Sequence, residues 1–540
     1  MATQVTLEAT VARGFGNPDG SRADLDQVLD DFVTFPERGA YGALATRADD
    51  RRVRLIVGAM GAGKTVYLRR LQACSRRDVS MYASRRRDEE PPSTELIVKV
   101  CQIYRANSLS ERWRRLWRVA ILRAVVSHIQ HERGLRRALS PHHLEILGRY
   151  GTLLGDGAIP EGVYEHLRQI LVVHHTEHAL NTYLEDRGWS AVQYVLAECL
   201  PGLPPICLYL DAVDDNYQAA PMYWLHCQRG LFEAVLHLLR DQDVGGRLHI
   251  IVGLRDIVLS SLLQTEQGPK YRGEEHIRVL RWDIDSLRYF LHAKVERLEP
   301  DFLMAPAERP GSMLSWLGTT TIRDDRREVD ESVETYLLRH TRSIPRDVVT
   351  LGNALSDLVE SRKAAGREVE PEAVRRVVSR SARGFAEAQL AQAANQLLTD
   401  LMPPQAARRD FLHSYMGADA YLRPEVADTL RRLIAVLTYD RFGRDDLTEW
   451  RRLASDAVAE LEPEGRHIDL ATILWQNGLL GFVRRERGET TFHFYDLSEV
   501  DHFSIPLDEL EYVLHPSLLD AIPSLRSAGA EPVSALRRFL

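Results

Sequence analysis

The segment from residue 55 to residue 71 contains the side chains best suited to chemistry. Its centre follows the pattern G-x-x-x-x-G-K-[ST], in which Gly58 is the first residue and Gly63, Lys64 and Thr65 are the last three. Glycines let backbone N–H groups curl around phosphate oxygens, the lysine brings positive charge to the β and γ phosphates, and the hydroxyl can bind Mg²⁺. The pattern therefore predicts a loop that binds the phosphates of a nucleotide. The alternative is an ordinary glycine-rich turn.

The residues on either side have the patterns that such a loop needs. Leu55 to Val57 form a short apolar run typical of a buried strand, and Leu68 and Leu71 begin the apolar stripe of a helix. That helix would place the positive end of its dipole behind the phosphates. We expect the nucleotide to be held by Gly58, Ala59, Met60, Gly61, Ala62, Gly63, Lys64, Thr65 and Val66.

A strand that ends in carboxylates could complete this site. The apolar run 206–210 ends in Asp211, and Asp214 and Asp215 follow it closely. At the carboxyl end of a buried parallel strand, one carboxylate can hold Mg²⁺ and another can orient the attacking water. We expect Thr65 and Asp211 in the Mg²⁺ shell, Asp211 through a water molecule, and Asp215 or Asp214 as the residue that orients the water. The alternative is a buried strand that ends in a solvated acidic turn.

A third apolar run, 248–254, ends in Arg255 and Asp256. An arginine at the same edge of the sheet could sense the γ phosphate, because its charge acts most strongly where the transferred group becomes negative. The alternative is a structural ion pair between Arg255 and Asp256 or the acidic turn. Both interpretations of Arg255 stay open at this point.

In this order, the three segments resemble P-loop NTPases of the additional-strand (ASCE) class, and specifically the AAA+ and STAND branch. The phrase LYLDAVDD is similar to the hhhhDxxDE motif of NACHT-like STAND ATPases, which matches Asp211 and Asp214. Asp215 stands where the family has glutamate, and its shorter side chain implies slow turnover. The resemblance covers residues 28–385 in outline.

A fourth segment, Ser343 to Val349, precedes an apolar helical stripe. It is similar to the "PRD" helix start of origin-recognition-type AAA+ lids, in which the arginine contacts the nucleotide as a second sensor. The resemblance implies this role for Arg346. The alternative is an exposed arginine in the first turn of a helix that Pro345 begins.

The resemblance implies a function as well as a fold. We expect a Mg²⁺-dependent switch that binds ATP and hydrolyses it, and that couples nucleotide state to homo-oligomer assembly or to a separately encoded effector protein. Several bacterial relatives are similar to components of anti-phage defence systems. The alternatives are a DNA-binding AAA+ ATPase of the origin-recognition or transposition-regulator type, and a non-hydrolysing ATP-bound scaffold. Arg255, Arg297 and Arg326 are equal candidates for an arginine that reaches a neighbour's nucleotide.

With 540 residues, and domains of roughly 150 residues each, the chain should hold three to four domains. The expected fold is an α/β P-loop ATPase core with a parallel sheet, a large helical insertion, a helical lid and a C-terminal winged-helix domain. The boundaries follow from where the motifs and periodicities change. We expect the first part of the core in 1–93, the insertion in 94–200, the second part of the core in 201–282, the lid in 283–385, and a helical linker, winged helix and cap in 386–540.

The expected insertion contains an apolar stripe that includes Trp113 and Trp117 at helical spacing. The tryptophans are interpreted as core residues more readily than as a base-stacking platform. Arginines lie largely outside the stripe, at Arg112, Arg114, Arg115, Arg118 and Arg123, with Arg133, Arg136 and Arg137 beyond it. They form either a patch for nucleic acid or an acidic partner, or a solvated helix face whose aliphatic stems cover apolar surface.

The C-terminal region reads as three helices followed by a hairpin, the order of a winged-helix domain. Pro424 opens the first helix, and the third ends near Gly478. Such domains place the third helix in a DNA major groove or pack it against protein. The residues to test are Trp475, Gln476 and Asn477 on that helix, and Arg484, Arg485 and Arg487 on the hairpin.

Composition narrows the class of protein further. A net charge of −8 argues against a chain whose whole surface coats nucleic acid. No signal-like N-terminus and no run of 18 apolar residues is present, so we expect a cytoplasmic protein without membrane contact. The five cysteines include no CxxC pair and read as reduced, mostly buried thiols. The pair His174 and His178 has a metal-compatible spacing but no completing ligand.

Overall fold

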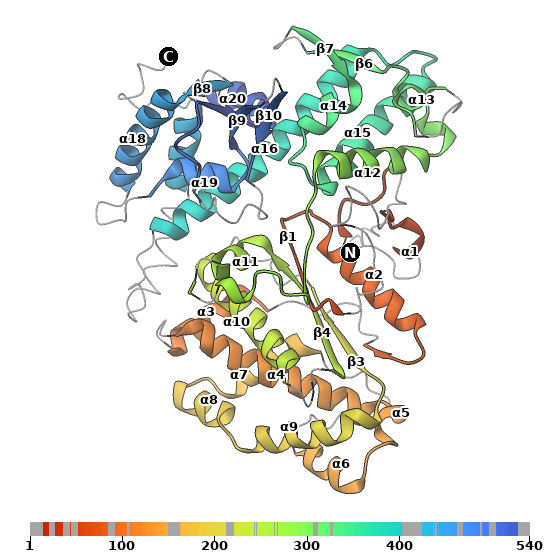
Figure 1. Cartoon of the computed structure of the whole chain (residues 1–540), viewed down its shortest axis with the longest axis vertical. Helices are drawn as coiled ribbons and strands as arrows, with labels where there is room; N and C mark the ends of the chain where they lie inside the picture. The colour runs from red at the N-terminus through yellow and green to blue at the C-terminus, as the bar shows by residue number, and fades with distance from the viewer. Residues whose placement is uncertain are drawn as a thin grey trace, which may run out of the picture.

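The computed structural model of the chain describes most of its residues. The described ranges are 14–20, 28–35, 44, 52–84, 92–104, 108–149, 162–211, 221–241, 244, 246–263, 265–266, 268–305, 311–324, 328–401, 424–435, 437, 440–461, 468–486, 489–495 and 504–527. Within them the chain forms a sheet core, a helical insertion, a helical unit that we call the lid, and a C-terminal unit (Figure 1).

The core is a five-stranded sheet in the order β2-β3-β4-β1-β5, and every neighbouring pair is parallel. Parallel strands covered on both faces read as continuous apolar runs, as the sequence of β1 and β3 does. The strands are β1 (Leu55–Gly58), β2 (Tyr82–Ala83), β3 (Ile206–Leu210), β4 (Leu248–Arg255) and β5 (Ile277–Val279). The α/β class expected from the sequence is confirmed for this core.

Two strands expected from the sequence agree closely with the structure, and a third strand of the sheet is very short. The runs at 206–210 and 248–254 form β3 and β4, with Arg255 as the last residue of β4. The apolar residues between 79 and 83 form a shorter strand than their side-chain types favour, because β2 contains only Tyr82 and Ala83. Val79 is fully exposed in the preceding turn, so its β-branched side chain has no packing partner that would favour a strand.

Helices cover both faces of the sheet. Helix α2 (Lys64–Arg77) contacts β1, β2, β3 and β4, whereas α10 (Pro221–Arg240) and α11 (Asp256–Leu263) pack from the other side. Leu55 and Val57 belong to the same hydrophobic core as α10 and α11, while Ile56 belongs to the core on the α2 side. The alternation of side chains along β1 therefore assigns each residue to one of the two layers.

The insertion extends the first of these cores. Its central helix α4 lies against α10 so closely that a Cβ atom on Gly230 would meet the Cβ atom of Trp113 at 2.3 Å. Trp113 and Trp117 are fully buried, which confirms their interpretation as core residues. The helices are α3 (Thr94–Tyr104), α4 (Leu109–His131), α5 (Arg133–Arg136), α6 (Pro141–Gly148), α7 (Val163–Val173), α8 (Glu177–Leu184) and α9 (Gly188–Cys199).

The lid follows β5 and includes a feature that the sequence did not indicate. Its helices are α12 (Ile284–Glu296), α13 (Met313–Leu317), α14 (Val333–Arg339) and α15 (Pro345–Ala364). Between α13 and α14 lies a two-stranded antiparallel hairpin of β6 (Thr321–Asp324) and β7 (Val329–Ser332), where an entirely helical region was expected. Helix α16 (Pro371–Leu401) then runs without interruption through the boundary expected at residue 385.

The C-terminal unit combines helices with a four-stranded antiparallel sheet in the order β10-β9-β11-β8. Its core is shared with the C-terminal half of α16, which also packs against α20. The elements are a helix over 424–435, β8 (Arg441–Gly443), α18 (Arg444–Leu461), α19 (Leu470–Gln476), β9 (Leu480–Glu486), β10 (Glu489–His493), β11 (Glu511–Leu514) and α20 (Pro516–Ser527). Over the described residues of the whole chain, no helix has the length and apolar character needed to cross a membrane.

Candidate phosphate-binding site

The glycine loop, residues 58–65, connects β1 to α2 as the sequence predicts. Gly61 and Gly63 have φ angles of 90° and 91°, in the left-handed region that side chains other than glycine rarely adopt. A Cβ atom on Gly58 would lie 3.1 Å from the Cβ atom of Ala62, so the loop folds tightly on itself. The backbone conformation and the tight packing of the loop therefore require glycine at these positions.

Lys64 is the first residue of α2, and its side chain is turned into the loop. Its Nζ donates hydrogen bonds to the carbonyl oxygens of Gly58 and Ala59, each at 3.1 Å. Lys64 is 8% exposed, which leaves its ammonium group with little contact with bulk water. A poorly solvated cation at a helix N-terminus is well placed to attract an anion, because both charge and dipole act through a weakly screened space.

Asp211 lies beside the glycine loop although more than one hundred residues separate them in the sequence. A Cβ atom on Gly253, in β4, would be 3.1 Å from Asp211 Oδ1 and 3.9 Å from Lys64 Cβ. Strand β4 lies between β1 and β3, so the parallel register brings the ends of both strands around Gly253. The hydroxyl of Tyr164 in α7 donates a hydrogen bond of 2.6 Å to the Asp211 carbonyl and links the insertion to this strand end.

Arg255 is paired in register with Gly58, so it lies at the same edge of the sheet as the glycine loop. It is 7% exposed, and its side chain is therefore buried at this edge. Asp214 and Asp215 lie outside the described residues, as does Arg326. Arg297 is exposed at the end of α12 in the lid.

Arg346 and Ile344 bring the lid onto the glycine loop. The backbone N–H of Arg346 donates to the carbonyl oxygen of Gly61 at 3.3 Å. A Cβ atom on Gly61 would lie 2.8 Å from Ile344 Cδ1 and 3.0 Å from Arg346 Cβ. The structure therefore places Arg346 next to the loop, and its Nε donates to the carbonyl oxygen of Pro18 at 3.3 Å.

An N-terminal segment, residues 14–20, also lines the site and was not expected from the sequence. A Cβ atom on Gly20 would lie 2.9 Å from Val66 and 3.3 Å from Thr65, at the start of α2. Asn353 of α15 holds the same segment by accepting from Phe15 N and donating to the Gly16 carbonyl, both at 2.8 Å. The only signal was the turn chemistry of Gly14, Gly16 and the residues that follow, which indicates an irregular segment but not what it contacts.

Met60, at the tip of the glycine loop, lies near α16. The side-chain amide of Gln392 approaches Met60 Sδ at 3.4 Å. A second contact joins the C-terminal unit to the core, since the hydroxyls of Ser260 in α11 and Tyr495 are 3.3 Å apart. Sequence periodicity could not have found these contacts, because they join segments more than two hundred residues apart.

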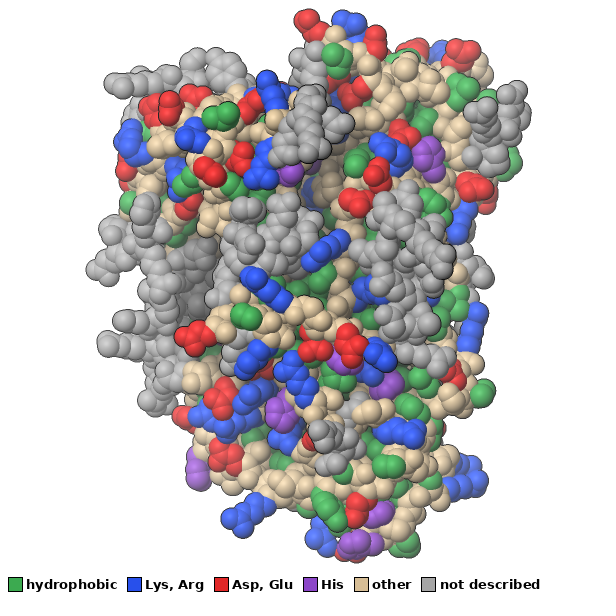
Figure 2. All heavy atoms as spheres, in the orientation of Figure 1, with side chains coloured by type: hydrophobic (Ala, Val, Ile, Leu, Met, Phe, Trp, Pro, Cys, Tyr) green, Lys and Arg blue, Asp and Glu red, His purple; other side chains and the backbone are tan. Residues whose placement is uncertain are grey.

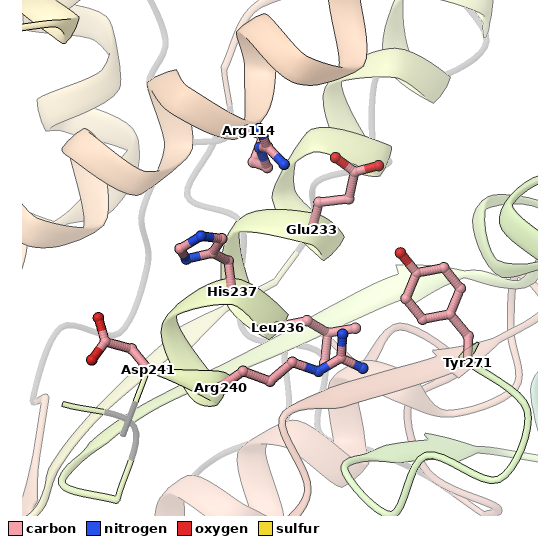
Figure 3. Close-up of a pocket in the computed structure, with 7 residues that line it drawn as sticks. All are labelled: Arg114, Glu233, Leu236, His237, Arg240, Asp241 and Tyr271. Carbon is pink, nitrogen blue, oxygen red and sulfur yellow. The ribbon is translucent and has the colours of Figure 1, made fainter. Parts of the chain in front are cut away.

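A cavity of about 340 Å³ lies elsewhere, between α4, α10 and the segment before β5 (Figure 3). Arg114, Glu233, His237 and Tyr271 are among the side chains that line it. It lies near the residues that precede β4 and β5, and hence at the amino ends of the strands, opposite to the glycine loop. This cavity is therefore separate from the glycine loop.

The arginines of α4 are engaged within the insertion. Arg115 forms ion pairs with Glu111 at 2.7 Å and Glu185 at 3.0 Å, and Arg112 donates to Asn181 at 3.1 Å. Arg118 contacts Gln193, and Arg123 donates to Gln169 and to the hydroxyl of Tyr183. On the face shown in Figure 2, basic side chains are interspersed with acidic ones. These contacts favour the structural interpretation of the arginines.

The helix and hairpin of the C-terminal unit show the same pattern. Asn477 donates to Gln396 of α16 at 2.8 Å, and Gln476 also contacts Gln396, so the end of α19 is packed against protein. Arg484 pairs with Glu509 at 2.6 Å, and Arg485 pairs with Glu511 at 2.9 Å. Arg487 lies outside the described residues. Packing between protein elements is therefore the better-supported interpretation of α19.

Comparisons of this chain with family models, with curated proteins and with solved structures find no match. Its function must therefore be inferred from the geometry of the site.

Proposed function

We propose that this chain is a Mg²⁺-dependent switch that binds and slowly hydrolyses ATP. The observation that carries the proposal is the convergence of three separate segments at the carboxyl edge of the sheet. Lys64 and Asp211 both lie within 4 Å of the position that a Cβ atom on Gly253 would occupy, and Arg346 contacts Gly61. A cation, a carboxylate and a second basic residue around a glycine loop are the groups that phosphoryl transfer requires.

The residues present fit a nucleotide triphosphate and its metal ion. The buried ammonium group of Lys64 is bonded to the carbonyls of Gly58 and Ala59 and could exchange these acceptors for phosphate oxygens. Thr65 and Asp211 are the oxygen donors that would hold Mg²⁺, which supplies positive charge against the phosphates. Asp214 and Asp215 remain the candidates for orienting the attacking water.

The lid gives the proposed switch a physical route. Arg346 is followed by Asp347, which is fully buried and accepts from Arg342 Nε at 2.8 Å and from its NH2 group at 2.6 Å. Arg342 in turn lies near the buried His515 at the end of β11, whose side chain is hydrogen-bonded to the backbone of Thr341. A change at Arg346 would therefore reach the C-terminal unit through a short chain of buried polar contacts.

We further propose that the nucleotide-dependent change drives assembly of a homo-oligomer or release of a separately encoded effector, as in anti-phage ATPase systems. Support comes from the joint placement of the lid and α16 against the glycine loop, since both would have to move if the loop changed its conformation. The measurement is the molar mass of the protein by light scattering, with and without a slowly hydrolysed ATP analogue. An unchanged mass in both conditions, with no released partner, would contradict assembly or release.

Replacing Lys64 with alanine tests the binding site. Loss of a charge-assisted contact of about 1.5–3 kcal/mol should weaken Mg²⁺-ATP binding by roughly 10- to 150-fold, measured by isothermal titration calorimetry. Lys99→Ala is the matched control, because Lys99 Nζ also donates to a backbone carbonyl, that of Leu171 at 3.1 Å, but lies in the insertion. Equal affinities for the Lys64→Ala variant and the unmodified protein would show that the site is wrongly assigned.

Turnover separates the switch from a non-hydrolysing scaffold. Steady phosphate release that disappears in Asp211→Ala and Asp215→Ala would support hydrolysis, because the first removes a metal ligand and the second the group proposed to orient water. Tight ATP binding without any phosphate release would instead support the scaffold. DNA binding is not favoured, since the arginines of α4 and β9 are engaged in the ion pairs and hydrogen bonds described above.

A further inference from the structure

A buried cysteine, a half-buried histidine and an exposed glutamate are aligned at the edge of the insertion, far in sequence from the glycine loop. The Sγ atom of Cys199, the last residue of α9, lies 3.1 Å from Nδ1 of His143 in the first turn of α6. The Nε2 atom of His143 lies 3.3 Å from Glu198 Oε2. The three groups therefore form a line of thiol, imidazole and carboxylate that runs from the edge of the insertion's core to its surface, and the proposed function does not use it.

The alignment determines which way a proton can move. Because the carboxylate of Glu198 accepts a hydrogen bond from the Nε2–H group of His143, it favours the tautomer in which Nδ1 carries a free lone pair. That lone pair faces the thiol of Cys199. Burial and the Glu198 charge raise the pKa of Cys199 to about 11, so the thiol is neutral at rest and needs a base at the moment of reaction.

The surroundings limit what can reach the sulfur. Cys199 is 6% exposed, so only a small molecule can approach it. The side chain of Glu198 is 44% exposed and is also hydrogen-bonded to Tyr194, so it presents its negative charge at the same surface. An anionic reagent would be repelled by this charge, whereas an uncharged one would not.

We propose that Cys199 is a covalent modification site for small, uncharged carbon electrophiles, with His143 as the base that accepts the thiol proton. The sulfur forms a bond to the electrophilic carbon, the bond from that carbon to the leaving group breaks, and the leaving group departs with the electron pair. The proton moves from Sγ to His143 Nδ1 and then to water. Glu198 acts as a positioning residue, because it holds the imidazole in the required tautomer.

The test is the rate of alkylation of each cysteine in the intact chain at pH 7.5, followed by mass spectrometry with iodoacetamide as the probe. The same molecule contains two reference thiols: Cys74, which is exposed, and Cys101, which is buried. An unassisted thiol that is 6% exposed and has a pKa near 11 should react more than about a hundredfold more slowly than an ordinary exposed thiol, because both burial and its small thiolate fraction slow the attack. With assistance from His143, we expect Cys199 to react within about tenfold of Cys74, since a positioned base contributes about a hundredfold or more.

Two variants and a second reagent separate assistance from simple exposure. His143→Gln should lower the rate at Cys199 by about a hundredfold and leave the rate at Cys74 unchanged. Glu198→Gln should lower the Cys199 rate to iodoacetamide, and should raise the relative rate of the anionic reagent iodoacetate, because the repelling charge is removed. If a variant were misfolded, Cys101 would also become reactive, and the other variant then decides the question. A Cys199 rate as slow as that of Cys101, or one unaffected by both variants, would overturn the proposal.

Discussion

Replacing Gly61 with alanine should detach the lid from the glycine loop, and Gly63→Ala provides a matched control. The two glycines have nearly the same φ, 90° and 91°, so an alanine at either position meets the same backbone strain of roughly 1–3 kcal/mol. Their surroundings differ. A Cβ atom at Gly61 would be 2.8 Å from Ile344 Cδ1 and 3.0 Å from Arg346 Cβ, whereas nothing lies within 4 Å of one at Gly63.

The difference between the variants isolates the contact with the lid. Overpacking typically costs 1–3 kcal/mol, and because the Ile344 methyl group is the end of a flexible side chain we take about 1–2 kcal/mol. That energy corresponds to roughly a 5- to 30-fold change in the population of the detached lid. The assay is hydrogen–deuterium exchange of the peptide that contains residues 344–349, since the Arg346 N–H is bonded to the Gly61 carbonyl.

We expect this peptide to exchange about 5- to 30-fold faster in Gly61→Ala than in Gly63→Ala. Peptides from α4, in the other hydrophobic core, should exchange equally in both variants and would reveal general unfolding. Equal exchange of residues 344–349 in the two variants would refute the placement of the lid on the loop.

Two other perturbations test the strand ends and the interface between the lid and the C-terminal unit. Gly253→Ala should push the Asp211 carboxylate aside and lower the rate of phosphate release by about tenfold. Gly246→Ala is the control, because nothing lies within 4 Å of its Cβ position, and it should leave the rate unchanged. Equal rates in the two variants would contradict the placement of Asp211 in the site. Burial lowers the pKa of His515 to about 4 and that of His340 to about 3, both below the ordinary value near 6.5. The unfolded chain therefore takes up protons first, and stability should fall as pH drops from about 6.5, by on the order of 2 kcal/mol per histidine at pH 5. Thermal unfolding from pH 7.5 to 5 measures this fall, and His515→Gln should flatten it; a midpoint that does not change over this range would show that these histidines are not buried as described.

The local patterns of the sequence were enough to predict the elements that build the site. The strand, loop and helix around Lys64 could be predicted from the single segment 55–71, because backbone sterics and hydrophobic periodicity act over short distances. The same holds for the buried run that ends in Asp211. That these two strand ends meet followed from the rule that carboxyl ends of parallel strands share one edge, once the parallel sheet was inferred.

Other features depend on contacts between distant residues and could not be read locally. Arg112 and Arg115 look like a basic surface in the sequence, but Asn181 of α8 and Glu185, the residue after that helix, are their partners. In the same way, Arg484 in β9 is neutralised by Glu509, and β2 is shorter than its apolar residues suggest because Val79 has nothing to pack against. Pairing and burial are properties of the folded chain. The arginine pattern of the sequence therefore suggested a surface for nucleic acid, whereas the folded chain engages these arginines in contacts with its own residues.

The amino-acid order was thus sufficient for the α/β class, the glycine loop and the neighbouring carboxylate, since each depends on residues that are close together or on the general geometry of parallel strands. Tertiary packing decided what surrounds them: the N-terminal segment on Thr65, the lid on Gly61, and α16 near Met60. It also decided that Cys199 faces His143. The physical reason is that the energy of such a contact depends on the distance between two side chains in space. That distance is determined by the packing of all the helices and strands that lie between them in the sequence.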